Sequence, residues 1–155
     1  MAKTANGSRT EVPKLPKKGT KPLKYNDKSP GQPLLATVFE QLSAILRPYA
    51  KGSLTLQADG GGQLHLQSTK TIGQPGEKKL GVHFASLLVQ KGYVGLYLMP
   101  VYAEPLLKNS IHPSLLQLLK GKSCFHIKKL DDALKSHVEK AIQAAYALYL
   151  AKGLL

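Results

Sequence analysis

The sequence contains little of several residue types, and each shortage excludes a class of structure. Its one cysteine, Cys124, excludes an internal disulfide and is typical of a reducing compartment. With no tryptophan and three phenylalanines, the core must be mainly aliphatic. No apolar run is long enough to span a membrane, and the first residues lack the apolar segment of a signal peptide. We therefore expect a cytoplasmic protein that does not associate with membranes.

Acidic residues and arginines are also scarce, which makes the chain strongly basic. It has 22 basic and 9 acidic residues, a net charge of +13. Arg9 and Arg47 are the only arginines, so lysine supplies nearly all of the positive charge. Lysine attracts polyanions as a point charge, without the bidentate geometry that reads bases. The composition predicts weak, non-specific polyanion binding, or a charge that serves only solubility.

The charge and the apolar residues divide the chain into two parts. Residues 1–32 alternate lysine with proline and contain apolar residues only singly, so this segment cannot offset its ordering entropy. We predict a disordered basic tail over 1–32 and one folded domain over 33–153.

Within the domain, the apolar period changes along the chain. From Pro33 to Leu46 apolar residues recur every three or four positions, which predicts a helix that proline opens. Alternating apolar residues then predict strands, and Asp131 caps a final helix. The predicted strands are 54–58, 64–67, 80–89, 93–99 and 123–129, with a short helix at 113–119. We predict an α+β fold of two layers, a mostly antiparallel five-stranded sheet with helices packed on one face.

Two sequence blocks carry a resemblance to a known family. Residues 92–102 read GYVGLYLMPVY and residues 121–129 read GKSCFHIKK. Both resemble YdhG-like small bacterial proteins (domain of unknown function 1801), which are loosely grouped with frataxin-like iron chaperones. The resemblance covers roughly residues 33–152 and implies the same α+β fold. It assigns no reaction, but its link to iron chaperones implies metal handling as an alternative function.

Side chains alternate across a strand, so the apolar parity marks the face that the helices cover. The opposite parity defines an open face, which includes Ala85 and several aromatic and polar side chains. Leu87 and Val89 of the third strand contradict this assignment, because they are apolar but have the parity of the open face. We predict a ligand-binding set on and beside this face for a small or anionic partner. Its members are Tyr93, Tyr97, Met99, Tyr102, Lys122 and Lys128. The same face could dock a second copy of the chain.

The open face also collects side chains that bind metals. His65, His83, Cys124 and His126 would give a nitrogen–sulfur site for zinc or another transition metal. Cys124 and His126 are two residues apart on one strand, about 7 Å at Cα, which one ion can bridge. No metal-binding spacing motif supports the set, and polar residues on a solvated sheet face are its ordinary alternative.

Cys124 and His126 could also form a nucleophile and base, but the sequence shows no oxyanion element or orienting acid for them. We therefore predict a non-enzymatic binding module without a cofactor, and a metal-handling, chaperone-like protein as the alternative.

Overall fold

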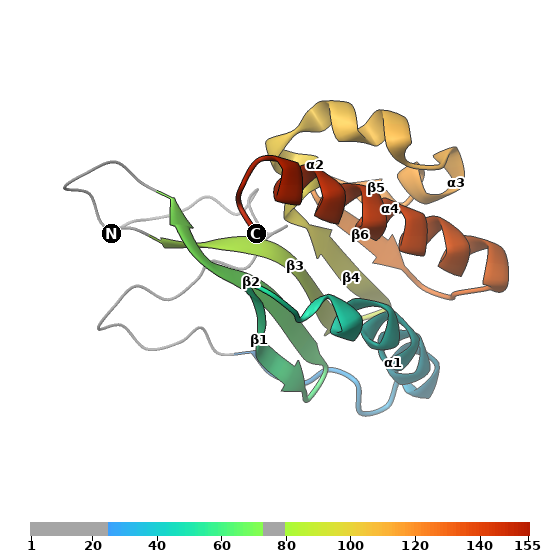
Figure 1. Cartoon of the computed structure of the whole chain (residues 1–155). Helices are drawn as coiled ribbons and strands as arrows, with labels where there is room; N and C mark the ends of the chain where they lie inside the picture. Colours follow the sequence, from blue (N-terminus) through green and yellow to red (C-terminus); the bar gives the residue numbers. More distant parts are fainter. Residues whose placement is uncertain (1–24, 73–79) are drawn as a thin grey trace, which may run out of the picture.

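The computed structural model describes residues 25–72 and 80–155. Helices and strands follow one another along the chain as Figure 1 shows. The elements are α1 (Pro33–Leu46), η2 (Arg47–Tyr49), β1 (Leu54–Gly60), β2 (Gln63–Ile72), β3 (Leu80–Gln90), β4 (Tyr93–Leu98), α2 (Met99–Ala103), η3 (Pro105–Ser110), α3 (Pro113–Leu116), β5 (Leu119–Lys120), β6 (Cys124–Ile127) and α4 (Asp132–Ala151).

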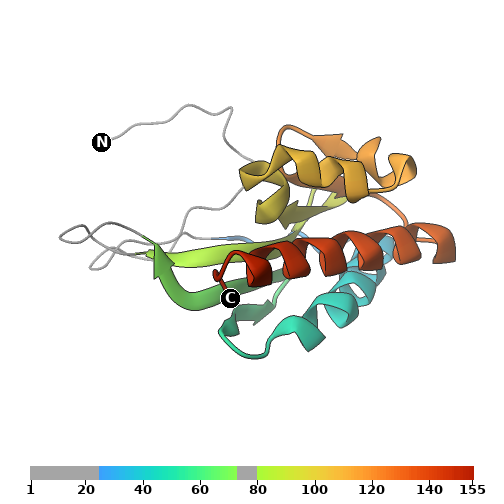
Figure 2. The same ribbon diagram turned by 45° about the horizontal axis from the view of Figure 1, so that its top comes forward.

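The strands form one antiparallel sheet in the order β1-β2-β3-β4-β6-β5. The long helices α1 and α4 lie on the same face of this sheet (Figures 1 and 2), and α2, η3 and α3 pack along α4. This confirms the α+β fold. The described sheet has six strands rather than five, because Leu119 and Lys120 pair with Phe125 and Cys124. A strand of two residues is too short to show an alternating pattern, so no sequence pattern indicated it.

The core lies between the sheet and the two long helices. The apolar stripe of α1 is buried from Leu35 to Leu46, but Leu34 is 63% exposed and does not belong to it, contrary to expectation. The stripe of α4 is buried around Ile142, and the Asp131 side chain accepts a hydrogen bond from the Leu134 amide at 2.8 Å, which confirms the predicted cap. Within the described ranges, no helix has the length and hydropathy of a membrane span.

A bulge in β3 explains the contradictory parity of the third strand. Leu66 of β2 pairs with Ala85, but Gln67 pairs with His83, so Phe84 is an extra residue. Phe84 and Ala85 both point into the core and are fully buried. The alternation therefore reverses after Phe84, and Leu87 and Val89 face the helices. Placing Ala85 on the open face was wrong, whereas His83 lies on that face with Ser86, to which it hydrogen-bonds.

Two other residues also depart from the predicted parity. Leu56 has the apolar parity of the predicted strand 54–58, which assigns it to the core, but it is 36% exposed because β1 is an edge strand with a register shift just after this residue. Met99 was placed on the open face, but β4 ends at Leu98 and α2 begins at Met99, with Pro100 in its first turn, where the missing N–H costs nothing. Met99 therefore packs against the main core.

The last part of the predicted tail contacts the sheet. The Tyr25 hydroxyl donates a hydrogen bond of 2.6 Å to the Val89 carbonyl. The side-chain amide of Gln32 donates a hydrogen bond to the Gln90 carbonyl and accepts one from the backbone N–H of Gly92. These two bonds hold the β3–β4 turn. Residues 25–32 thus contact the folded domain, because the side chains of Tyr25 and Gln32 satisfy polar backbone groups at the β3–β4 turn. The remainder of the predicted tail, 1–24, lies outside the described residues.

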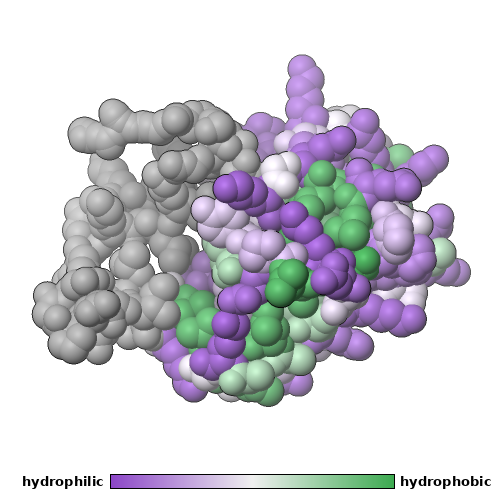
Figure 3. All heavy atoms as spheres, turned by 90° about the horizontal axis from the view of Figure 1, so that it is seen from above, coloured by the Kyte–Doolittle hydropathy of each residue, from purple (hydrophilic) through white to green (hydrophobic). Residues whose placement is uncertain are grey.

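The surface formed by α2 and η3 mixes hydrophobic and hydrophilic areas. Figure 3 shows green side chains separated by purple ones on this side of the molecule. Leu106 of η3 and Tyr102 of α2 are among the exposed large hydrophobic residues, at 79% and 49%. Single exposed apolar residues of this kind are common on monomeric proteins.

Candidate functional site

A pocket of about 500 Å³ lies on the sheet face opposite α1 and α4, and we call it the sheet pocket. Strands β3, β4 and β6 and the β5–β6 turn supply its walls. The residues that line it are Gln90, Tyr93, Tyr97, Lys120, Gly121, Cys124 and His126. Four residues that the sequence marked as candidates, two tyrosines and the Cys124–His126 pair, therefore come together in one place.

Cross-strand pairing places these side chains side by side. Tyr97 of β4 lies opposite Cys124 of β6, and Cys124 lies opposite Lys120 of β5. Gly95, opposite His126, has no side chain and leaves room for the Tyr97 ring. Directly opposed residues share a face of the sheet, so the short strand β5 brings a lysine to the edge of the pocket.

The floor of the sheet pocket is buried. Tyr97 is 4% exposed and Cys124 2% exposed, and together with Leu88 they form a second apolar cluster against which Tyr25 packs. Burial, with a contribution from the neighbouring Cys124, raises the pKa of the Tyr97 hydroxyl. This hydroxyl consequently stays protonated at neutral pH and can donate a hydrogen bond.

The rim of the pocket is aromatic and basic. The rings of Tyr93 and His126 stack with centroids 3.8 Å apart and planes 9° from parallel. Burial, and then the charges of Lys120 and Lys128, lower the pKa of His126, so its imidazole is neutral at pH 7. The described residues that line this pocket include no carboxylate. The combination of a neutral aromatic platform and lysines suits an anion with a flat ring.

The other predicted ligand-binding residues lie outside the pocket lining. Lys128 is exposed just beyond β6, close enough for its charge to act on His126. The Lys122 ammonium lies 5.7 Å from the centre of the Tyr102 ring, so these two residues interact with each other. Met99 packs on the core, as described above. Of the six predicted ligand-binding residues, two thus line the sheet pocket and four lie outside its lining.

The predicted metal ligands fall into two pairs. Cys124 and His126 line the sheet pocket, whereas His65 and His83 lie toward β2, with ring centroids 6.4 Å apart. Ser86 connects the second pair, because its hydroxyl lies 2.7 Å from His65 Nδ1 and 2.8 Å from His83 Nε2. Over residues 25–72 and 80–155, no three His, Cys, Asp or Glu side chains gather in a way that could hold a metal ion.

The hydrogen bonds of the Ser86 group define which ring nitrogens carry protons. His65 Nε2 lies 3.1 Å from the side-chain oxygen Oε1 of Gln63 and donates to it, so His65 Nδ1 accepts from Ser86. Ser86 then accepts from His83 Nε2, which leaves His83 Nδ1 as a buried acceptor without a protein partner. Burial, and then the nearby His65, lower the pKa of His83 to about 4. This group is therefore neutral and structural at physiological pH.

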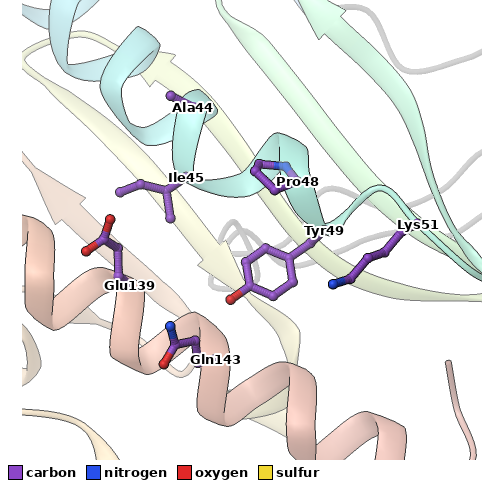
Figure 4. A pocket seen from close by; sticks show the side chains of 7 residues that line it. All are labelled: Ala44, Ile45, Pro48, Tyr49, Lys51, Glu139 and Gln143. Atoms are coloured by element: carbon purple, nitrogen blue, oxygen red, sulfur yellow. The ribbon is translucent and has the colours of Figure 1, made fainter.

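A second pocket, of about 440 Å³, lies between α1 and α4 on the other side of the sheet (Figure 4). Glu139 and Gln143 of α4 face Tyr49 and the end of α1 across it. The Lys51 ammonium lies 5.9 Å from the Tyr49 ring centre. The Glu139 carboxylate in this second pocket would repel an anion, so the sheet pocket is the better anion site.

Three features of the site were missed from the sequence. Gln90 is on the open face only because the bulge reverses the parity of β3. Lys120 joins the site through β5, and Tyr25 reaches the pocket floor from a segment read as tail. The lysines on both sides of residue 125 were a usable signal for Lys120, whereas no sequence pattern indicated Tyr25.

The chain was compared with models of known protein families, with curated proteins and with solved structures, and none of these comparisons found a match.

Proposed function

We propose that this protein is a non-enzymatic binding module whose sheet pocket holds a small organic anion. The observation that carries the proposal is the neutral His126–Tyr93 stack between Lys120 and Lys128, in a pocket lined by no described carboxylate. Lysines at the rim attract the charge, and the aromatic rings give area to a flat ligand.

Further support comes from groups that can fix the orientation of a ligand. The Tyr97 hydroxyl stays protonated at the pocket floor, where it interacts with Cys124 and Gln90 and holds the Gln90 side chain in place. The Gln90 amide and the Lys120 ammonium add donors on two sides. A volume of about 500 Å³ falls within the range of small-molecule sites. Cys124, 2% exposed in an apolar cluster with Leu88 and Tyr97, fits a packing role better than a nucleophilic one.

Isothermal titration of the full chain with phenyl phosphate and with inorganic phosphate tests this function. We expect phenyl phosphate to bind at one site and more tightly than phosphate, because its ring contacts the aromatic rim. The Lys120→Gln variant should weaken binding several-fold. Lys140→Gln, on the opposite layer in α4, is the matched control with the same change of charge and should bind normally. Equal losses in both variants, or no binding at millimolar phenyl phosphate, would contradict the proposal.

A further inference from the structure

The stacked Tyr93–His126 pair is only partly buried, although aromatic rings this close normally belong to a core. The two residues come from neighbouring strands of an open sheet face, and His126 lies opposite Gly95, which has no side chain. Such a partly exposed, uncharged aromatic surface on a sheet is a stacking platform for unpaired nucleobases.

The charge around this platform extends well beyond the pocket. From residue 80 to residue 130 the chain contains six lysines and a single acidic residue, Glu104. Glu104 forms a salt bridge with Lys152, the residue that follows α4, with nitrogen and oxygen 2.8 Å apart. The β3–β6 part of the molecule thus has an excess of positive charge with little internal compensation, as a site for a phosphate backbone requires.

We propose that the ligand of the sheet pocket is a nucleotide unit of single-stranded nucleic acid. The base stacks on the Tyr93–His126 platform, and its phosphate lies between Lys120 and Lys128. This inference rests on the proposed anion-binding function and names the chemical class of the anion. The pocket volume of about 500 Å³ accommodates one nucleotide.

The site should not read sequence. Base readout relies mainly on bidentate arginine, asparagine or glutamine contacts to base edges. Residues 80–130 contain no arginine, and Gln90 is the one glutamine that lines the pocket among the described residues. Stacking accepts any base, so affinity should depend on strandedness and on salt rather than on sequence.

Fluorescence anisotropy with the full chain separates stacking from charge. The probes are a twelve-nucleotide oligothymidylate, its uridylate counterpart, an abasic strand of equal length and a duplex of equal length. We expect both base-carrying single strands to bind about tenfold more tightly than the abasic strand. The duplex, whose bases are inaccessible, should show no such gain. Equal affinity for the thymidylate and the abasic strand would overturn the inference and identify the surface as a general polyanion site.

Two pairs of variants locate the effect. Tyr93→Leu should abolish the advantage over the abasic strand, and Tyr93→Phe, which keeps the ring, should retain it. Lys120→Gln should reduce the slope of log affinity against log salt by about 0.7, whereas the control Lys140→Gln should leave it unchanged. If phenyl phosphate binds but the thymidylate has no advantage, the nucleic-acid inference fails and the anion site stands. If phenyl phosphate does not bind either, the proposed function fails with it.

Discussion

The Tyr97 ring lies over Gly95 at a distance that leaves little room for a side chain there. A Cβ atom on Gly95 would lie 3.0 Å from Tyr97 Cε1 and 3.3 Å from Cys124 Sγ. Both neighbours line the sheet pocket. The shape of the pocket floor therefore depends on this glycine.

We expect Gly95→Ala to impair the pocket while the domain stays folded. The added methyl group would displace Tyr97 and Cys124 by a few tenths of an ångström, and a strand accepts alanine in place of glycine. Phenyl phosphate affinity should fall several-fold, measured by isothermal titration, while the melting temperature changes little. Unchanged affinity would show that the floor tolerates the methyl group and does not define the site.

The buried His83 should make the protein less stable in acid. Its pKa in the folded state is lowered to about 4, against an ordinary value of 6.5, so the unfolded chain binds its proton first. The stability that neutral His83 contributes is complete above about pH 6.5 and is lost as pH falls toward 4. The loss amounts to about 3 kcal/mol.

Urea denaturation at pH 7 and pH 4.5 measures this effect. His83→Gln keeps a side-chain donor for Ser86 but cannot titrate, so its free energy of unfolding should vary less with pH than that of the unchanged protein. Burial also lowers the pKa of His65, which contributes in the same direction, so some acid sensitivity should remain in the variant. Identical pH profiles for the two proteins would exclude His83 as the cause.

The two adjacent aspartates before α4 should have unequal effects on stability. The Asp131 carboxylate accepts a hydrogen bond from the Leu134 amide at 2.8 Å, and Asp131→Ala should lower the free energy of unfolding by about 1 kcal/mol. Asp132, in the first turn, interacts with the helix dipole only, and Asp132→Ala should cost about 0.3 kcal/mol. Thermal and chemical denaturation of both variants compares them directly, and equal losses would show that the cap bond is not the stabilising contact.

Much of the fold could be predicted from the sequence, because long apolar periods identify their elements. Helix α1 was predicted correctly from the apolar stripe between Leu35 and Leu46. The hairpin of β1 and β2 was predicted correctly from the alternation around Leu64 and Leu66. The parity rule also placed Tyr93, Tyr97, Cys124 and His126 on one face, and the structure brings them to one pocket.

The remaining features depend on tertiary contacts that leave no local pattern. The bulge at Phe84 is visible only when β2 and β3 are paired, and it decides the direction of Gln90 and Ser86. Strand β5 exists only because β6 offers it a partner. Tyr25 reads as part of a basic tail, since its hydrogen bond partner, Val89, is 64 positions away.

Two truncations should separate the contacting segment from the residues before it. Removing residues 1–31 deletes the hydrogen bond from Tyr25 to Val89 and the packing of Tyr25 on the pocket floor, whereas removing residues 1–24 keeps both. We expect the longer truncation to be less stable than the shorter one by about 1–2 kcal/mol. Equal stability by urea denaturation would mean that Tyr25 adds nothing to the fold.

The central claim, an anion held beside His126, is tested most directly by the pKa of that residue. Lys120 and Lys128 contribute to lowering it, and a bound anion would offset their charges. We therefore predict that the His126 pKa, followed by NMR of its ring Cε1–H signal, rises as phenyl phosphate is added. The pKa of His137, on α4, serves as the internal reference and should stay constant. A His126 pKa that is unchanged at saturating phenyl phosphate, or that shifts together with that of His137, would contradict the account.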